Sequence, residues 1–203
     1  VSRIQANGRH LLALINDVLD LSKVEAGHME LEITSVVLST LVVETLSELG
    51  SQAQSRNVRL TGVYPASQVV IDADGPKLKQ VLINLVANAL KFSGDNEVRV
   101  ILKTDARTGR PTRIDVVDKG IGIPPERLQG IFEAFQQADN STARRFGGTG
   151  LGLTISRSLA QLMGFTIEAT SQVGVGSTFS IVLTPAVAPA IAERPALRGV
   201  ASP

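Results

Sequence analysis

The chain has 203 residues, a formal net charge of +1, no cysteine, no tryptophan and one tyrosine. The near-neutral charge and scarce aromatic residues argue against a nucleic-acid partner, and the lack of cysteine excludes disulfides, thiolate metal sites and thiol catalysis. No apolar run approaches the ~18 residues of a membrane span and no signal-peptide pattern follows Val1, so we expect one sizeable domain with appendages, cut from a longer chain.

Residues 1–28 predict one helix of a bundle. Two rows of residues recur every seven positions, as they do in packed helices: Ile4, Leu11 and Val18, and Asn7, Leu14 and Leu21. Gly27 is a suitable stop. The helix is either buried on its own domain or belongs to a bundle whose other helices lie outside this sequence. His10 sits beside the apolar stripe, where a surface or packing role is favoured over chemistry.

Residues 29–72 predict scaffold elements without recognisable chemistry. The alternation of residues 29–34 predicts a short strand, and residues 38–53 have helical periodicity. Residues 58–64 and 69–72 predict two more strands, separated by a turn at 65–67.

Residues 74–93 predict a helix with an unusual polar stripe. Asp74 before Pro76 is a good helix start. Four residues fall at core-facing spacing: Leu78, Leu82, Leu85 and Ala89. Asn84, Asn88 and Lys91 form a second stripe at i, i+4 and i+7. Asparagine is a poor residue for a helix interior, so the stripe indicates either a solvated face or a site where an amide oxygen ligates Mg²⁺ and a lysine meets phosphate.

Residues 97–104 and 112–118 predict a hairpin with a turn at 108–111. The second strand ends at Asp118, and Gly120 and Gly122 follow it. A carboxylate beside such a clear space can accept a hydrogen bond from an exocyclic amine and so read adenine, although a simple loop acid with turn glycines is the alternative. Pro124 then starts a predicted helix over residues 125–135.

A polar segment and a second glycine turn follow. Residues 136–148 predict a mobile lid, in which Arg144 and Arg145 either reach a phosphate or stay solvated. In GGTGLGL (147–153), four glycines fall within six positions and a helix over 150–163 begins. Such a turn presents N–H groups to an anion, or is a hinge without a ligand. It matches neither a Walker A loop nor a dinucleotide fingerprint.

Residues 165–171 and 177–183 predict the two closing strands, with a third glycine turn between them in which Thr178 offers a hydroxyl. The Pro/Ala-rich residues 185–203 predict a linker.

Five motifs stand in a fixed order along the chain: NLVANALKF (84–92), DKGIGI (118–123), IFEAF (131–135), GGTGLGL (147–153) and SQVGVGSTF (171–179). Together they closely resemble the N box, the first glycine box, the F box, the second glycine box and the last glycine turn of the bacterial sensor histidine kinases. Those kinases belong to the wider ATPase superfamily of gyrase, MutL and the heat-shock chaperones. LLALINDVLDLSKVEAG (11–27) resembles the end of the second dimerisation helix of hybrid kinases, so the resemblance covers roughly residues 3–184.

The resemblance implies an α+β fold, a two-layer α/β sandwich in which helices back a mixed sheet, preceded by a bundle helix. It divides the chain into the end of the dimerisation helix (1–28), the catalytic ATP-binding domain (29–184) and a linker or tail (185–203). ATP would lie between the N-box helix and the lid.

The resemblance also implies the roles of individual residues. Asn88 would ligate Mg²⁺, Lys91 would meet the phosphates and Phe92 would line the pocket. Asp118 would read the adenine amine. The residues around the base would be Gly120, Gly122 and Ile123. The residues over the phosphates would be Thr149, Gly150, Leu151 and Gly152. Thr178 would support the edge of the base.

Asn84, which with Lys91 is the residue we assign to catalysis, separates the branches of the superfamily. Hydrolytic members place a glutamate there to activate water, and an asparagine cannot act as a general base. The resemblance therefore implies a protein-histidine kinase that keeps the γ-phosphate for a histidine. The alternatives are an ATPase of the same superfamily and a nucleotide-binding pseudokinase or interaction module.

The sequence departs from the family at the acceptor. In the family, the acceptor histidine precedes a Glu-hydrophobic-Arg-Thr-Pro sequence, and neither His10 nor His28 has this context. We therefore expect a cytoplasmic fragment that binds ATP and Mg²⁺ without labelling itself. The expected partners are the dimerisation and acceptor helices of a homodimeric parent, which an inner-membrane anchor could hold, and a response-regulator receiver domain in the same chain or another. No nucleic acid is expected.

Overall fold

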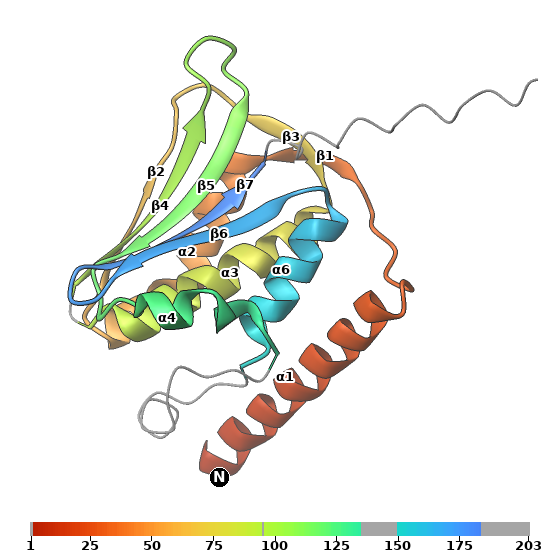
Figure 1. The fold of residues 1–203 in the computed structure, drawn as a ribbon, viewed down its shortest axis with the longest axis vertical. Coiled ribbons are helices and arrows are strands. Elements are labelled where there is room, and N and C mark those ends of the chain that lie inside the picture. Colours follow the sequence, from red (N-terminus) through yellow and green to blue (C-terminus); the bar gives the residue numbers. More distant parts are fainter. Residues whose placement is uncertain (1, 95, 135–149, 184–203) are drawn as a thin grey trace, which may run out of the picture.

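A computed structural model gives the structure of the protein and describes residues 2–94, 96–134 and 150–183. Helices lie on one face of a five-stranded sheet, and a two-stranded sheet stands beside it (Figure 1). In chain order the elements are α1 (Ser2–Glu25), β1 (Thr34–Val37), α2 (Leu38–Ser55), β2 (Arg59–Val63), β3 (Val70–Ala73), α3 (Gly75–Phe92), β4 (Glu97–Thr104), β5 (Pro111–Asp118), α4 (Pro125–Leu128), the 3₁₀ helix η1 (Gly130–Phe132), α6 (Gly152–Leu162), β6 (Thr166–Gln172) and β7 (Gly176–Val182).

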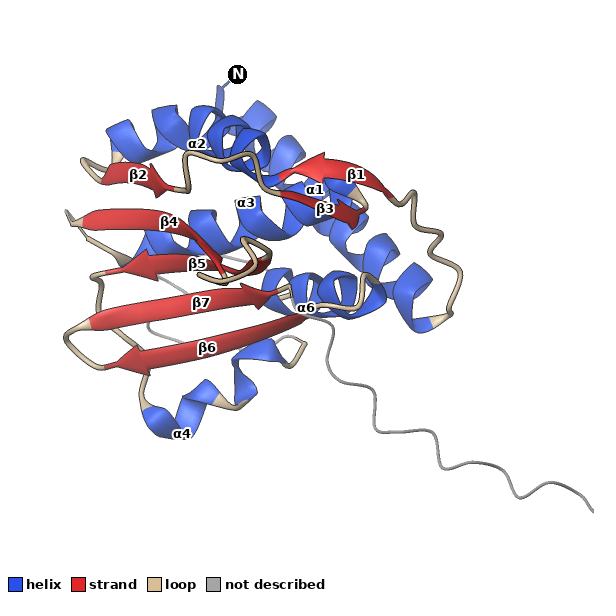
Figure 2. Ribbon diagram, turned by 90° about the horizontal axis from the view of Figure 1, so that it is seen from above, coloured by secondary structure: helices blue, strands red, loops and turns tan. Residues whose placement is uncertain are grey.

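The large sheet has the strand order β2-β4-β5-β7-β6, which can be followed in Figure 2. β2 and β4 run parallel, and the other neighbours run antiparallel. The predicted hairpin is β4–β5, and the two predicted closing strands are β6 and β7. The expected mixed sheet backed by helices is therefore confirmed, and β5 is its middle strand.

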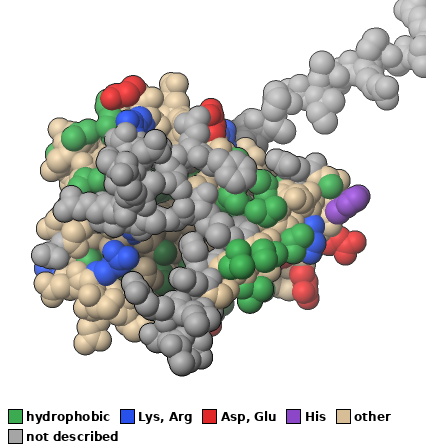
Figure 3. All heavy atoms as spheres, turned by 90° about the horizontal axis from the view of Figure 1, so that it is seen from below, with side chains coloured by type: hydrophobic (Ala, Val, Ile, Leu, Met, Phe, Trp, Pro, Cys, Tyr) green, Lys and Arg blue, Asp and Glu red, His purple; other side chains and the backbone are tan. Residues whose placement is uncertain are grey.

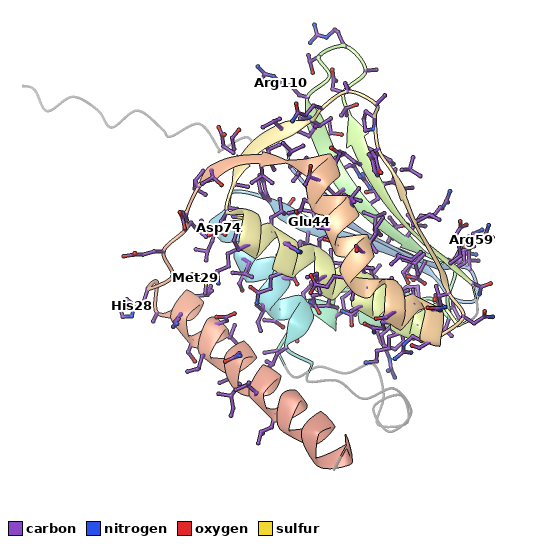
Figure 4. The ribbon with its side chains drawn as sticks, turned by 180° about the vertical axis from the view of Figure 1, so that it is seen from behind. His28, Met29, Glu44, Arg59, Asp74 and Arg110 are labelled. Atoms are coloured by element: carbon purple, nitrogen blue, oxygen red, sulfur yellow. The ribbon has the colours of Figure 1, made fainter. Side chains whose placement is uncertain are left out.

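α3 forms the centre of the helical layer. All four residues predicted for its core face are buried: Leu78, Leu82, Leu85 and Ala89. Asp74 lies at the start of the helix (Figure 4), where its Oδ1 accepts a hydrogen bond from the N–H of Lys77 at 2.9 Å. Such a cap contributes about 1 kcal/mol and fixes where the helix begins.

The outer face of the sheet, away from the helices, holds a buried carboxylate. Asp115 accepts from Lys103 Nζ at 2.8 Å and from Arg113 Nε at 2.6 Å, and Arg113 also donates to Ser180 Oγ at 2.7 Å. Burial opposes ionisation of Asp115, but its hydrogen bonds with Lys103, Arg113 and Ser180 outweigh that effect and hold its pKa below the ordinary value. These bonds join β4, β5 and β7.

α1 packs on the domain through its C-terminal end. Leu21, Val24 and the following Met29 contact the core, and Gln80 Nε2 on α3 donates to Asp20 Oδ2 at 3.0 Å. The helix ends near Gly27, as predicted, with a φ of 67°. Its other face is exposed and apolar, and Figure 3 shows hydrophobic side chains gathered on this side of the molecule. The large exposed hydrophobic residues of α1 are Leu11, Leu12, Ile15, Val18 and Leu19. No helix in the described part of the chain has the length and apolarity to cross a membrane.

The strand predicted at residues 29–34 is wrong, because β1 occupies Thr34–Val37. β1 pairs with β3 from Thr34 opposite Ala73 onward, and β3 ends there because α3 begins. The preceding backbone has no strand to pair with. Instead, the N–H of Glu32 donates to Asp74 Oδ2 at 3.1 Å, so the helix cap replaces the expected ladder.

The helix predicted over residues 125–135 is also corrected. The structure has the short α4, then a 3₁₀ turn that begins at Gly130, and residue 135 lies outside the described residues. Glycine disfavours a continuous helix. The turn brings Phe132 against Phe179 of β7 at 6.5 Å between ring centroids, and Arg157 of α6 lies 5.5 Å from the Phe132 ring centre.

Candidate functional site

Asp118 lies at the C-terminal end of the middle strand, between Val98 of β4 and Ser177 of β7. Only 5% of it is exposed, and its Oδ1 accepts a hydrogen bond from the N–H of Gly120 at 2.8 Å. Burial raises the pKa of this carboxyl, while hydrogen bonds from Gly120 and Ser177 oppose the rise. A buried ionisable group at a strand end is the arrangement expected of a ligand-reading residue.

The hydroxyl beside this carboxylate belongs to Ser177, and the role predicted for Thr178 at the edge of the base stays a prediction. Ser177 pairs with Asp118 across β5 and β7 and hydrogen-bonds to its side chain. Thr178 pairs with Val117, and because successive side chains of a strand point to opposite faces, it faces the outer side of the sheet. The backbones come this close because Gly176 has no side chain: a Cβ there would lie 2.1 Å from the Asp118 carbonyl oxygen.

Gly120 is placed by the end of α3. A Cβ on Gly120 would lie 2.1 Å from the carbonyl oxygen of Phe92, and the next N–H, that of Ile121, donates to the same oxygen at 3.3 Å. The predicted pocket residues Phe92 and Gly120 are therefore in direct contact. The first glycine box is fixed to the N-box helix through backbone atoms.

Gly122 is placed by the turn between β6 and β7. Its φ is 69°, and a Cβ there would lie 2.1 Å from the carbonyl oxygen of Gln172. The N–H of Gly174 donates to Ile121 O at 2.9 Å, and the N–H of Ile123 donates to Ser171 Oγ at 2.7 Å. The first and last glycine motifs thus form one packed unit around Asp118.

Asn84, the first residue of the polar stripe, contacts α6. Asn84 Nδ2 donates to Ser156 Oγ at 2.7 Å, and a Cβ on Gly152 would lie 2.5 Å from Asn84 Oδ1. Asn84 therefore connects the N-box helix to the first turns of α6. Asn88 and Lys91 follow on the same side of α3, one and two turns farther along.

Lys91 is a half-buried cation. Burial lowers the pKa of its ammonium group, and the positive charge of Arg56 at the end of α2 lowers it further. Its Nζ lies 4.8 Å from the centre of the Phe92 ring. A second cation nearby makes an anionic ligand favourable here, because the ligand would relieve the repulsion between like charges.

The second glycine box leads into α6 with Gly150 at a φ of 72° and Leu151 buried. The first turn of α6, which begins at Gly152, contains no acidic residue, so the positive end of this helix favours an anion. Thr149 and the predicted lid, with Arg144 and Arg145, lie outside the described residues.

Asn88 is the predicted ligand of Mg²⁺. No three His, Cys, Asp or Glu side chains gather as a metal site in the described part of the chain. Asn88 offers one amide oxygen, a hard ligand that suits Mg²⁺ when the phosphates of a nucleotide supply further oxygens. The residues therefore fit a metal that arrives with its nucleotide.

Three serines of this site were not predicted from the sequence: Ser156, Ser171 and Ser177. The signal for Ser177 was the register, because a residue that pairs with Asp118 must share its face of the sheet. Ser156 carried no such signal, since its partner Asn84 lies 72 positions away in the chain, and the contact of Ser171 with Ile123 spans 48 positions.

Comparison with known proteins identifies the family of this domain. The family model described as histidine kinase-, DNA gyrase B- and HSP90-like ATPase matches residues 73–187, and the chain belongs to this family. Similar curated proteins are named histidine kinases. The circadian input-output histidine kinase CikA of Synechococcus elongatus is 41% identical over 89% of this chain and 24% of its own length. The histidine protein kinase DivJ of Caulobacter vibrioides is 39% identical over 95% of this chain and 32% of its own length.

Solved structures give the same result. Full-length ShkA in complex with AMPPNP superposes with a TM-score of 0.78 and 30% identity, over 89% of this chain and 37% of that one. The catalytic domain of the histidine kinase ThkA superposes with a TM-score of 0.62 and 26% identity, over 74% of this chain and 94% of that one. Within its family the chain is an ATP-binding catalytic domain of the histidine kinase type, and it spans a third or less of the two curated relatives.

Proposed function

We propose that this domain binds ATP together with Mg²⁺ and transfers the γ-phosphate to a histidine outside residues 1–203, as part of a two-component sensor kinase. The observation that carries the proposal is the buried Asp118 at the end of the middle strand, in contact with the loop that touches α3 at Phe92. An ionised carboxylate accepts from the adenine amine. Asn88 and Lys91 lie on α3, the helix whose last residue, Phe92, contacts the loop that follows Asp118.

The residues divide the work of such a transfer. Lys91 and the start of α6 would hold the phosphates, and Asn88 would hold Mg²⁺, which neutralises phosphate charge when bound. Asn84 supports transfer to a protein over hydrolysis, because its amide donates to Ser156 and an amide accepts no proton from water at neutral pH. Catalysis would then rest on positioning and charge.

The exposed apolar side of α1 supports the proposed partners. Its five large side chains need a cover of the kind that the dimerisation and acceptor helices of a homodimeric parent would supply. We further propose that residues 185–203 connect to a receiver domain, and that the domain works in the cytoplasm, where ATP is supplied. The boundaries at 28 and 184 belong to this proposal.

The nucleotide site is tested by calorimetric titration of the domain with ADP and ATP, with and without Mg²⁺. We expect one saturable site in the wild type. Asn88→Ala should remove most of the gain in affinity that Mg²⁺ gives, whereas Asn16→Ala, which removes an exposed helical asparagine from α1, should change nothing. A folded wild type that binds neither nucleotide would overturn the proposal and favour the interaction module.

The destination of the phosphate is tested with γ-labelled ATP. The domain alone should gain no acid-labile label and should release little phosphate. Stoichiometric phosphohistidine on His10 or His28 would contradict an acceptor outside the chain. Rapid release of inorganic phosphate would favour the ATPase alternative.

A further inference from the structure

Ser171, at the end of β6, lies at the centre of a hydrogen-bond network beneath the adenine-reading carboxylate. The N–H of Ile123 donates to its Oγ at 2.7 Å, its hydroxyl donates to Gly176 O at 2.9 Å, and its Oγ lies 2.9 Å from Ser177 Oγ. Ser177 in turn hydrogen-bonds to the Asp118 side chain. One half-buried hydroxyl therefore contacts the first glycine box, the last glycine turn and the direct neighbour of Asp118.

We propose that Ser171 is a positioning residue for adenine recognition, which acts through Ser177 on Asp118. A serine hydroxyl carries one proton and can accept two hydrogen bonds. In the proposed arrangement Ser171 accepts from Ile123, and its single proton is shared between Gly176 O and Ser177 Oγ, which both lie 2.9 Å away. The hydroxyl of Ser177 donates to the ionised Asp118. Each bond in such a chain polarises the next, so the effect of Ser171 reaches the carboxylate without contact.

The backbone around Ser171 explains why a hydroxyl is needed at this position. Gly122 packs directly on the carbonyl group of Gln172, so the two loops touch without side chains between them. The Ser171 hydroxyl and the hydrogen bond from Gly174 N–H to Ile121 O are two polar links between these loops. Alanine at 171 leaves the N–H of Ile123 without its acceptor and Ser177 without its donor.

This inference rests on the proposed function, and its readout is the choice between bases. Inosine triphosphate carries a 6-oxo group in place of the 6-amino group, so a well-oriented carboxylate favours ATP over it. Wild type, Ser171→Ala, Ser171→Thr and Thr170→Ala are titrated with ATP and inosine triphosphate by calorimetry. Thr170 is exposed on the same strand and points to the opposite face, so its variant is the matched control.

We expect Ser171→Ala to lose about tenfold of the ATP preference, the size of one charge-assisted hydrogen bond. Ser171→Thr keeps the hydroxyl and should retain the preference, and Thr170→Ala should match wild type. An unchanged ratio in Ser171→Ala, or an equal loss in Thr170→Ala, overturns the inference. If Ser171→Ala does not fold, Ser171→Cys, whose thiol is a weak donor of similar shape, must lose the preference for the inference to stand. Failure of the wild type to bind ATP is a separate result that removes the proposed function itself.

Discussion

Asp118→Asn is expected to separate the stability of the domain from its ligand binding. The wild-type carboxyl is buried, and burial raises its pKa above the ordinary value of 3.8. The folded state therefore bears a desolvation cost for the ionised group at neutral pH, which the neutral amide avoids. The amide oxygen of the variant can still accept from the N–H of Gly120. We expect the free energy of unfolding at pH 8 to stay equal or to increase.

The same change should weaken adenine binding. An amide nitrogen in place of a carboxylate oxygen offers a donor to the donating amine of adenine, and a charge-assisted hydrogen bond is lost. That bond is worth about 1.5–3 kcal/mol, so the dissociation constant for ATP should rise roughly 10- to 150-fold.

The pH dependence of the free energy of unfolding gives an independent check on the cost of burying Asp118. The folded pKa of Asp118 lies above the unfolded one, so between the two the folded state binds more protons. Stability from this group is therefore lost as pH rises from 3.8 through the folded pKa. The difference in stability between Asp118→Asn and wild type should grow over that window and be constant above it.

The assay is denaturant unfolding from pH 3.5 to 8, with ATP titration at pH 8. Asp72→Asn, an exposed aspartate on β3, is the control and should match wild type in both. A variant that loses stability at pH 8, or that binds ATP as wild type does, would contradict the role assigned to Asp118.

Two further changes test the packing around the site. Gly152→Ala should destabilise the domain by about 1–3 kcal/mol, because the new methyl group would lie 2.5 Å from Asn84 Oδ1. The control is Gly50→Ala in α2, where a Cβ meets open space, and it should be neutral or stabilising. Equal effects of the two changes in thermal unfolding would contradict the contact. Asp115→Asn should lower the free energy of unfolding by about 1–2 kcal/mol at pH 7, since its partners stay partly solvated. Because the folded pKa of Asp115 lies below 3.8, this advantage of wild type should shrink as pH falls below 3.8, and urea unfolding at pH 7 and pH 3 measures it.

Local sequence patterns were sufficient to predict the amphipathic helices. The helical spacing of Leu78, Leu82 and Leu85 was sufficient, because a helix makes its backbone hydrogen bonds within itself. The strand at residues 29–34 failed for the opposite reason. A strand needs a neighbour, and the chain opposite it becomes the start of α3 at Asp74. Pairing between residues some 40 positions apart cannot be read from alternation alone.

The hydroxyl beside Asp118 could not be predicted from the sequence for a similar reason. Thr178 and Ser177 both offer a hydroxyl, and only the register of β7 against β5 decides which of them faces Asp118. That register depends on the close approach of Gly176 to the end of β5. The position of Asp118 at a strand end was predicted correctly, because the alternation of β5 and the following glycines mark the end of the strand in the sequence. Its burial was not predicted.

The glycine motifs are relevant to the choice between a kinase and a pseudokinase. Gly120, Gly122 and Gly176 each lie against a backbone oxygen of a neighbouring segment, so a side chain at any of them would disrupt the fold. Such glycines are required for folding whether or not a nucleotide binds, and a pseudokinase with this fold would need them too. Intact glycine boxes therefore do not separate a kinase from a pseudokinase. Asn88 and Asp118 would separate them, because their proposed roles are in nucleotide binding, and the titrations of Asn88→Ala and Asp118→Asn test those roles directly.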